Sequence, residues 1–188
     1  MSLFPPCPVV IVLAAGRGER FAASGGSVHK LQALLAGKRV IDHVLDAVKA
    51  SGLAYHVVEA DPARPGMGDS IAAGVKATPG ATAWLILPAD LPLIQSDTMR
   101  KIAFAPPRAV TVPIFQGQRG HPVRFGLECM SELLNLQGNQ GAVQLIRAQE
   151  ATDSIAMIDV DDVGCVMDVD TLDDLQRAET LLASRKPA

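Results

Sequence analysis

Aromatic residues are scarce in this sequence, at 4% of 188 residues, with one Trp and one Tyr. A surface that stacks on nucleic-acid bases needs several exposed rings, so this composition argues against such a surface. Positive charge is not in excess either, because 17 Lys and Arg stand against 20 Asp and Glu, and no basic stripe is visible. We therefore expect no nucleic acid among the partners.

Cysteine is also scarce, and its three copies, Cys7, Cys129 and Cys165, lie far apart in the sequence. No CxxC pair occurs, which argues against a disulfide framework and against a zinc site. We interpret all three cysteines as small buried hydrophobic residues in a protein kept in a reducing compartment.

Long hydrophobic runs are absent, and none approaches the roughly 20 residues that cross a bilayer. Residues 1–8 show neither the charged nor the apolar region of a signal peptide. We expect a cytoplasmic protein that contacts no membrane. The length predicts one domain over residues 1–188, with a frayed tail at about 185–188.

Apolar runs alternate with segments of helical period along most of the chain. Val9–Ala15 is a β-branched run without polar alternation, which is typical of a strand buried on both faces. Further strands are predicted at 55–59, 83–87, 109–113 and 155–160. Helices are predicted from Val40 to a stop at Ser51-Gly52, at 70–78, at 97–104 after a Ser96 cap, at 128–136, at 141–150, and from Leu172 after a Thr171 cap. This order predicts a three-layer, doubly wound α/β fold with a mostly parallel sheet.

The segments between these elements are predicted to be loops. They comprise 16–26, 61–68 and 117–123, and we interpret Asp159, Asp161 and Asp162 as a solvated acidic turn. Ligands of doubly wound sheets bind at the carboxyl ends of the strands. Three polar features fall there: the loop after Ala15, Asp90, and the stretch Asp168–Asp170.

The loop after the first strand contains Gly16 and Gly18, whose backbone amides could cradle phosphate oxygens. Arg17, Arg20 and Lys30 could neutralise a triphosphate. The alternative is an ordinary glycine turn with solvated arginines. A dinucleotide-binding fingerprint is excluded by Phe21, and a Walker A loop is excluded by Arg39 after Gly37-Lys38.

Three carboxylates are candidate metal ligands. Asp90 follows a buried strand between Pro88 and Pro92, and extended backbone puts Asp168 and Asp170 on one side. Magnesium takes one or two carboxylates together with substrate phosphates, which these residues could supply. Alternatively, Asp90 caps a turn and Asp170 caps the last helix.

Taken together, these motifs resemble those of the MobA-like nucleotidyltransferases, and most closely the molybdenum cofactor cytidylyltransferase branch. The resemblance covers nearly the whole chain in order. It rests on Leu13–Phe21 with Lys30, Gly66–Gly74, Pro88–Pro92, Gly120–Pro122, Gly138–Ala142 and Asp168–Thr171. It implies a Rossmann-like nucleotidyltransferase fold.

The resemblance also implies roles for individual residues. Catalytic roles fall to Arg20, Lys30 and Asp90, and metal binding to Asp90, Asp170 and Asp168. The nucleotide would be bound by Leu13, Ala14, Ala15, Gly16, Arg17, Gly18, Lys30, Ser70 and Asp90. The acceptor would be bound by His121, Pro122 and Gln140.

The implied reaction joins a nucleoside monophosphate from a triphosphate to the phosphate of molybdopterin or its molybdenum-loaded form, with Mg²⁺ as cofactor. Ala15 favours CTP, because Leu-Ala-Ala-Gly resembles the cytidylyl branch and Leu-Ala-Gly-Gly the guanylyl branch. A molybdoenzyme or its chaperone would receive the product. The sequence departs from the family pattern at His29 and Arg39, where proline is frequent, and at 138–140, which lacks the usual acidic residue.

Three alternatives stay open. They are a GTP-using guanylyltransferase, a nucleotidyltransferase acting on a sugar phosphate or methylerythritol phosphate, and a non-catalytic chaperone that binds the cofactor. The presence of both Lys30 and Asp90 argues against simple loss of activity.

Overall fold

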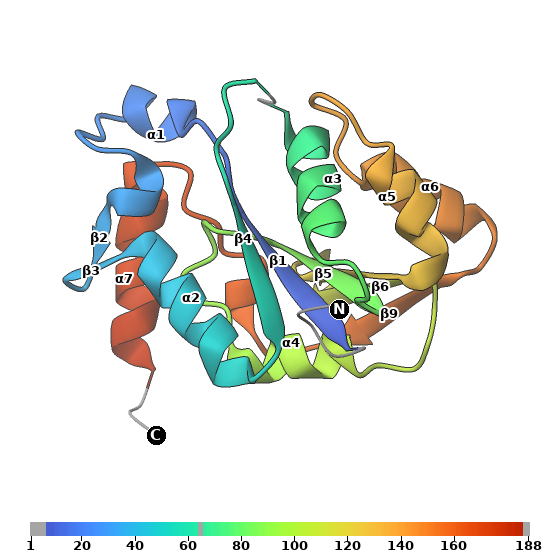
Figure 1. Cartoon of the computed structure of the whole chain (residues 1–188). Coiled ribbons are helices and arrows are strands. Elements are labelled where there is room, and N and C mark those ends of the chain that lie inside the picture. Colours follow the sequence, from blue (N-terminus) through green and yellow to red (C-terminus); the bar gives the residue numbers. More distant parts are fainter. Residues whose placement is uncertain (1–6, 64–65, 186–188) are drawn as a thin grey trace.

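A twisted sheet runs through the centre of the protein (Figure 1). The computed structural model describes residues 7–63 and 66–185. The strand order of the sheet is β4-β1-β5-β8-β6-β7, and β9 pairs with the other edge of β6. The strands are β1 (Pro8–Ala14), β4 (Ala54–Glu59), β5 (Ala83–Pro88), β6 (Val110–Phe115), β7 (Gln118–Arg119), β8 (Val123–Gly126) and β9 (Ile155–Asp159). β2 (Leu34–Leu35) and β3 (Lys38–Arg39) form a separate small hairpin.

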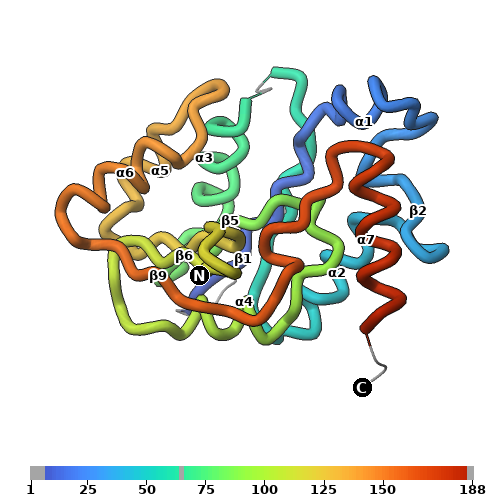
Figure 2. The backbone as a smooth tube through the Cα atoms, turned by 180° about the vertical axis from the view of Figure 1, so that it is seen from behind, coloured from blue at the N-terminus to red at the C-terminus, as the bar shows by residue number. Residues whose placement is uncertain are grey.

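Helices cover both faces of this sheet (Figures 1 and 2). The α-helices are α1 (Glu19–Ala23), α2 (Val40–Ser51), α3 (Met67–Ala77), α4 (Ser96–Ala103), α5 (Met130–Leu134), α6 (Val143–Ala151) and α7 (Leu172–Ser184). Short 3-10 helices are η1 (Lys30–Gln32), η2 (Leu127–Cys129) and η3 (Val163–Cys165). No helix in the described ranges has the length and hydrophobicity that crossing a membrane requires.

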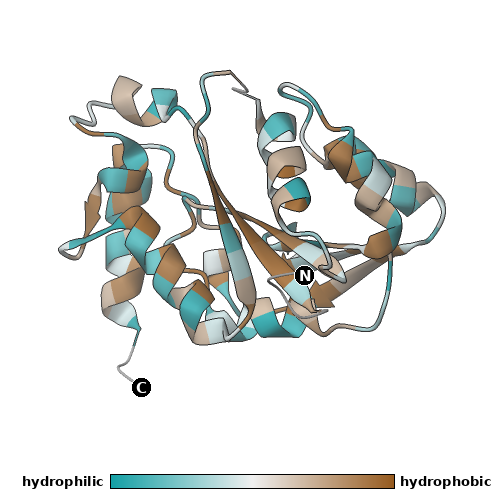
Figure 3. Ribbon diagram, viewed as in Figure 1, coloured by the Kyte–Doolittle hydropathy of each residue, from teal (hydrophilic) through white to brown (hydrophobic). Residues whose placement is uncertain are grey.

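The two faces of each central strand belong to different hydrophobic cores, because successive side chains of a strand point to opposite sides. Val10 and Val12 of β1 pack with α2, α4 and α7, whereas Val9 and Ile11 pack with α3, α5 and α6. A strand buried on both sides is apolar along its length, and Figure 3 shows hydrophobic colours along most of β1. The prediction of a three-layer α/β fold is therefore confirmed.

The sheet is mostly parallel, as predicted. β1 pairs in parallel with β4 and β5, and β6 pairs in parallel with β9. The exceptions are β7, which is antiparallel to β6, and β8, which lies antiparallel between β5 and β6. The amino end of β8 therefore lies at the edge of the sheet where the parallel strands have their carboxyl ends.

The predicted loop at 117–123 is wrong in part, because β7 and the start of β8 lie within it. These two strands form the return limb of a hairpin with β6. Thr111 pairs with Arg124 and Ile114 pairs with Arg119. The four residues 120–123 therefore lie opposite only two residues of β6, at positions 112 and 113, and form a bulge. Such bulges turn a side chain out of the regular strand, and they are frequent beside active sites.

Other predicted boundaries also need correction. The loop at 16–26 contains α1, α3 begins at Met67 within the predicted loop 61–68, and Ser96 is the first residue of α4 rather than its cap. The cap position belongs to Gln95. The cap at Thr171 is confirmed, because its hydroxyl accepts a hydrogen bond from the amide of Asp174.

The cysteines differ in burial. Cys129 and Cys165 are buried as predicted, but Cys7 is partly exposed. Burial raises the pKa of the Cys129 and Cys165 thiols to about 11, so both stay protonated at neutral pH. Of the tail predicted to be frayed, residues 186–188 lie outside the described residues.

The interpretation of Asp162 as part of a solvated turn is wrong, since this residue is 2% exposed. Its carboxylate accepts hydrogen bonds from the amide and side chain of Gln95, from Thr98 Oγ1 at 2.8 Å and from the amide of Gly164 at 2.9 Å. Burying a carboxylate is tolerated when several donors replace its hydration. Asp162 thereby anchors the chain that follows β9 to the start of α4.

We expect Asp162→Ala to lower the free energy of unfolding by about 3 kcal/mol, because it leaves several buried donors without an acceptor. Asp161→Ala, at the exposed neighbouring position, is the matched control and should change it by less than about 0.5 kcal/mol. Urea denaturation of both variants measures the difference. Equal stability of the two variants would contradict the anchoring role.

Candidate active site

A cavity of about 850 Å³ opens at the carboxyl ends of β1 and β5. The first strand leads into it through Ala15, and β5 leads into it through Pro88 and Asp90. These two strands are neighbours, with Leu13 paired to Pro88, and the amide of Ala89 donates to the carbonyl of Leu13. The pairing brings the glycine loop and Asp90 to the walls of one cavity.

The glycine loop leaves β1 and turns into α1 at Gly18, whose φ of +67° is a conformation that side chains disfavour. Within the part of the chain that the structure describes, the amides of Gly16, Arg17 and Gly18 donate to no protein acceptor. Free amide hydrogens at the mouth of a polar cavity are suitable donors for an anion. These free amides are the donors that the predicted phosphate-binding role of the loop requires.

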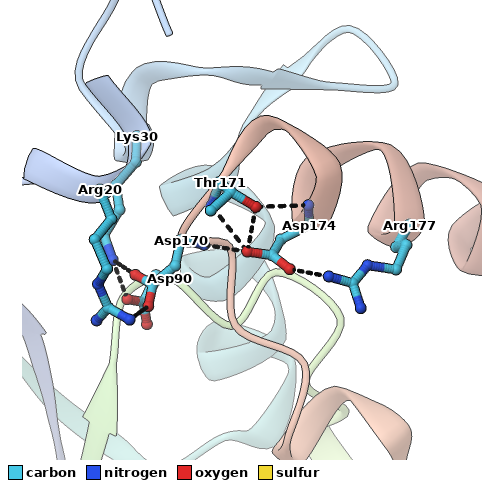
Figure 4. A network of polar contacts seen from close by, with 7 residues as sticks. All are labelled: Arg20, Lys30, Asp90, Asp170, Thr171, Asp174 and Arg177. Atoms are coloured by element: carbon cyan, nitrogen blue, oxygen red, sulfur yellow. Dashed lines mark hydrogen bonds and ion pairs between the residues drawn. The ribbon is translucent and has the colours of Figure 1, made fainter. Parts of the chain in front are cut away.

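Lys30 lies at the centre of the polar contacts, and Figure 4 shows it between two carboxylates. Its Nζ lies 2.6 Å from Asp90 Oδ2 and 2.6 Å from Asp170 Oδ1. Arg20 Nη1 lies 2.7 Å from the second oxygen of Asp170. The side chains of Lys30, Asp90 and Asp170 are only 11%, 18% and 13% exposed, whereas that of Arg20 is 79% exposed.

Asp170 is held in place by the start of α7. The amides of Asp170 and Thr171 both donate to Oδ2 of Asp174, and the other carboxylate oxygen of Asp174 pairs with Arg177 (Figure 4). The amide of Val169 donates to the carbonyl of Asp90 at 2.9 Å. This backbone contact fixes the two carboxylate-bearing segments relative to each other.

The charges in this cluster shift two pKa values. Burial lowers the pKa of Lys30, but Asp90 and Asp170 outweigh it, so the net shift is above the ordinary 10.5. Because the folded pKa is raised, the stabilisation from this ammonium is complete below pH 10.5 and is lost as the pH rises through the folded pKa. Partial burial and the neighbouring Asp170 raise the pKa of Asp168.

The two carboxylates fit a divalent cation. Both reach a single point, which the Lys30 nitrogen now occupies, and hard carboxylate oxygens suit Mg²⁺ or Mn²⁺. No group of three or more His, Cys, Asp or Glu in the described ranges is arranged to hold a metal ion by itself. A metal held by Asp90 and Asp170 would therefore need further oxygens from a substrate or from water.

The opposite wall is formed by the start of α3 and the segment 137–141. The amide of Gly68 donates to the carbonyl of Gly138 at 2.8 Å, and a Cβ on Gly66 would lie 2.0 Å from that same oxygen. Only glycine permits so close a backbone contact. Two motifs that lie about 70 residues apart in the sequence are thus packed against each other.

His121 lies in the bulge between β7 and β8, and a cis peptide bond joins it to Pro122. Its imidazole lines the cavity, and its buried Nδ1 has no hydrogen-bond partner among the described residues. Burial lowers its pKa, which favours the neutral ring. A neutral imidazole with one free nitrogen can exchange a hydrogen bond with a bound molecule.

Most of the residues named from the sequence line this one cavity. They are Leu13, Ala15, Gly16, Arg17, Gly18, Arg20, Lys30, Ser70, Asp90, His121, Asp168 and Asp170. Three of the residues named from the sequence, Ala14, Pro122 and Gln140, do not line it. The residues on either side of Gln140, Asn139 and Gly141, do line the cavity.

Sequence reasoning missed some features of the cavity. An apolar wall of Ile71, Ile86, Phe125 and Ile146 comes from three different elements and from the antiparallel strand that was not predicted. His29 is named above only as a departure from the family pattern, although its Nε2 lies 2.8 Å from the carbonyl oxygen of Gly16. The signal in the sequence is the position of His29 directly before Lys30.

Comparison with known proteins gives a match to one family. The profile of the MobA-like NTP transferase domain matches residues 10–153. Among curated proteins, the chain is 25% identical to the purine catabolism protein PucB of Bacillus subtilis, over 88% of this chain and 93% of PucB.

Several solved structures share the fold of this chain. Rv0371c of Mycobacterium tuberculosis is 25% identical with a TM-score of 0.75, over 95% of this chain and all of that one. Rv0371c has also been solved as a complex with manganese, with 21% identity and a TM-score of 0.72, over 94% of this chain and all of that one. Molybdopterin-guanine dinucleotide biosynthesis protein A of Archaeoglobus fulgidus shares the fold, with 16% identity and a TM-score of 0.64, over 94% of this chain and all of that one.

The bridging ammonium predicts a competition with divalent cations. We expect Lys30→Met to bind Mn²⁺ about tenfold more tightly than the unsubstituted protein when no nucleotide is present, because the cation between the two carboxylates is gone. Isothermal titration calorimetry measures the affinity, and Mn²⁺ should raise the melting temperature of the variant more than that of the parent.

Lys38→Met is the matched control, since Lys38 pairs with Asp46 on the surface. It should leave Mn²⁺ binding unchanged. If Lys30→Met and the parent protein bound Mn²⁺ equally, the proposed competition would be wrong.

Proposed function

The chain belongs to the MobA-like NTP transferase family, and from this premise we propose that it is a cytidylyltransferase of molybdopterin-type cofactors. The observation that carries the proposal is the meeting of Lys30, Asp90, Asp170 and the free amides of the glycine loop in one cavity. Cationic groups, amide donors and a pair of carboxylates are the parts needed to bind a triphosphate together with a divalent ion.

In the proposed reaction, a phosphate oxygen of the acceptor attacks the α-phosphorus of the nucleoside triphosphate. A phosphoanhydride bond forms, the bond to the β-phosphate oxygen breaks, and pyrophosphate leaves. A phosphomonoester is already anionic near neutral pH, so the reaction needs no strong general base. Catalysis in such transfers consists mainly of positioning and charge neutralisation.

The residues of the cavity have separable roles in this proposal. The amides of Gly16 and Gly18 bind the triphosphate, and Ser70 and the start of α3 border the nucleoside. Lys30 and Arg20 neutralise negative charge that develops on the leaving pyrophosphate. Lys30 can do so because its raised pKa keeps it protonated throughout the neutral range.

The proposed cofactor is Mg²⁺, held by Asp90 and Asp170, with Asp168 nearby. When bound, such an ion supplies positive charge to the phosphate oxygens. The manganese complex of Rv0371c supports divalent-metal binding on this fold. In this chain, the converging oxygens of Asp90 and Asp170 support the same role.

The acceptor is proposed to lie against the second half of the cavity. His121 Nδ1 offers a hydrogen bond there, and Ile86 and Phe125 supply an apolar surface suited to a ring system. A molybdopterin-type acceptor is supported by the resemblance of the sequence motifs and by the name of the Archaeoglobus fulgidus protein that shares the fold. Pro122 and Gln140 are proposed to shape this subsite through their neighbours, because Pro122 follows His121 and Gln140 precedes Gly141 in the sequence.

Asp90→Asn should lower turnover by at least about a thousandfold, since loss of a metal-holding carboxylate costs several kcal/mol of transition-state stabilisation. The measurement is pyrophosphate release with CTP, Mg²⁺ and molybdopterin, and circular dichroism should show an unchanged fold. Asp97→Asn, at an exposed position of α4, serves as the control with normal turnover. Near-normal turnover of Asp90→Asn would refute the assignment, and no pyrophosphate from the parent protein would favour a non-catalytic carrier.

The proposed nucleotide preference depends on Ala15, which lines the cavity. We expect CTP to be used at least about tenfold more efficiently than GTP, and Ala15→Gly to reduce that ratio, because removal of the methyl group enlarges the space available to a purine. Paired measurements of kcat/KM with both nucleotides test this. A parent protein that prefers GTP would be a guanylyltransferase instead.

A further inference from the structure

We propose that His29 is a positioning residue that clamps the glycine loop to the turn carrying Lys30, so that the loop amides and the ammonium bind a polyphosphate as one unit. The inference rests on the proposed function, because it concerns the site for the triphosphate. It assigns a role to a histidine that stands where the family pattern frequently has proline.

Two hydrogen bonds fix the imidazole of His29. Its Nε2 lies 2.8 Å from the carbonyl oxygen of Gly16, and its Nδ1 lies 3.3 Å from the amide nitrogen of Leu31. Since the Leu31 amide can only donate, Nδ1 must accept and Nε2 must carry the hydrogen that Gly16 accepts. The ring therefore joins the loop after β1 to the first turn of η1.

The ring also packs directly against the loop. A Cβ on Gly18 would lie 3.3 Å from both Cδ2 and Nε2 of His29, and 3.5 Å from Cγ of Lys30. The left-handed backbone at Gly18 thus rests on the side chains of His29 and Lys30. Any change in the position of the ring would be transmitted to the loop.

The loop has few other restraints. Among the described residues, the His29 contact is the one hydrogen bond that ties Gly16 or Arg17 to another segment, since Arg17 pairs only with Glu19 inside the loop, at 3.5 Å. By contrast, Lys30 is firmly held through Asp90 and Asp170. His29 therefore ties the exposed loop to the turn that carries Lys30 and the buried Leu31.

Holding the Gly16 carbonyl has an electrostatic benefit for an anion site. A free carbonyl oxygen near a phosphate would repel it, whereas an oxygen already bonded to an imidazole N–H has a fixed direction and a reduced negative charge. The neighbouring amides of Gly16, Arg17 and Gly18 remain free to donate. Preorganised donors bind more tightly because less freedom is lost on binding.

Three substitutions separate the two contacts. His29→Gln carries an amide donor on a side chain about as long as the imidazole, so it can still reach the Gly16 oxygen. His29→Asn is one methylene shorter; its oxygen can accept from the Leu31 amide, as Asn does when it caps a turn, but its donor does not reach Gly16. His29→Ala removes both contacts.

His43→Asn is the matched control. The Nε2 of His43 also lies within hydrogen-bond distance of a backbone carbonyl, 2.9 Å from that of Leu35, but His43 is on α2 and does not line the cavity. It should therefore alter nucleotide binding by less than about twofold.

The experiment is calorimetric titration of each variant with CTP, and separately with GTP, in the presence of Mn²⁺ and without acceptor. We expect Asn and Ala at position 29 to weaken binding about tenfold and Gln to stay within about threefold of the parent, which corresponds to loss or retention of one hydrogen bond. Melting temperatures should stay within about 2 °C, because His29 is exposed.

Two results would overturn the inference. One is His29→Asn binding the nucleotide as tightly as the parent, and the other is weaker binding accompanied by an equivalent loss of melting temperature, which would indicate a general structural role. If the parent protein bound neither nucleotide, the proposed function would fail and this inference with it. Failure of the proposed function is distinguishable from failure of this inference, because it is seen in the titration of the parent protein alone.

Discussion

The ammonium of Lys30 between Asp90 and Asp170 is the interaction on which the site depends. Two carboxylates that reach the same point repel each other unless a cation lies between them. With Arg20 on the outer oxygen of Asp170, two positive groups balance two negative ones. Lys30 thus holds the two carboxylates in the converging arrangement that the proposed metal site requires.

The fold supports this interaction from several directions. Parallel pairing of β1 with β5 brings the glycine loop to Asp90, and the backbone bond between Val169 and Asp90 brings the last acidic segment beside it. The buried carboxylate of Asp162 holds the chain that leads to this segment. The antiparallel β8 serves a different purpose, because it delivers His121 to the same edge of the sheet from the opposite chain direction.

Much of the architecture could be predicted from the sequence because buried parallel strands require unbroken apolar runs, as in β1 and β5. β8 could not, since its four residues include a charged Arg124 and follow a bulge that breaks the alternation. The site residues Lys30, Asp90 and Asp170 were predictable from motif chemistry and from the rule that strand ends form sites. The burial of Asp162 was not, because its donors come from Gln95 and Thr98, more than 60 residues away. Family membership and a nucleotidyltransferase fold agree with the motifs.

The partners of Lys30 lie 60 and 140 residues further along the chain. During translation, the strands that flank the glycine loop leave the ribosome long before Asp170 is made. A partly synthesised chain can therefore pair β1 with β5, but it cannot form the second ion pair of Lys30, because Asp170 is not yet present. In the proposed function, the polyphosphate site is therefore complete only after α7 has packed in place, which happens later than the synthesis of every strand of the sheet.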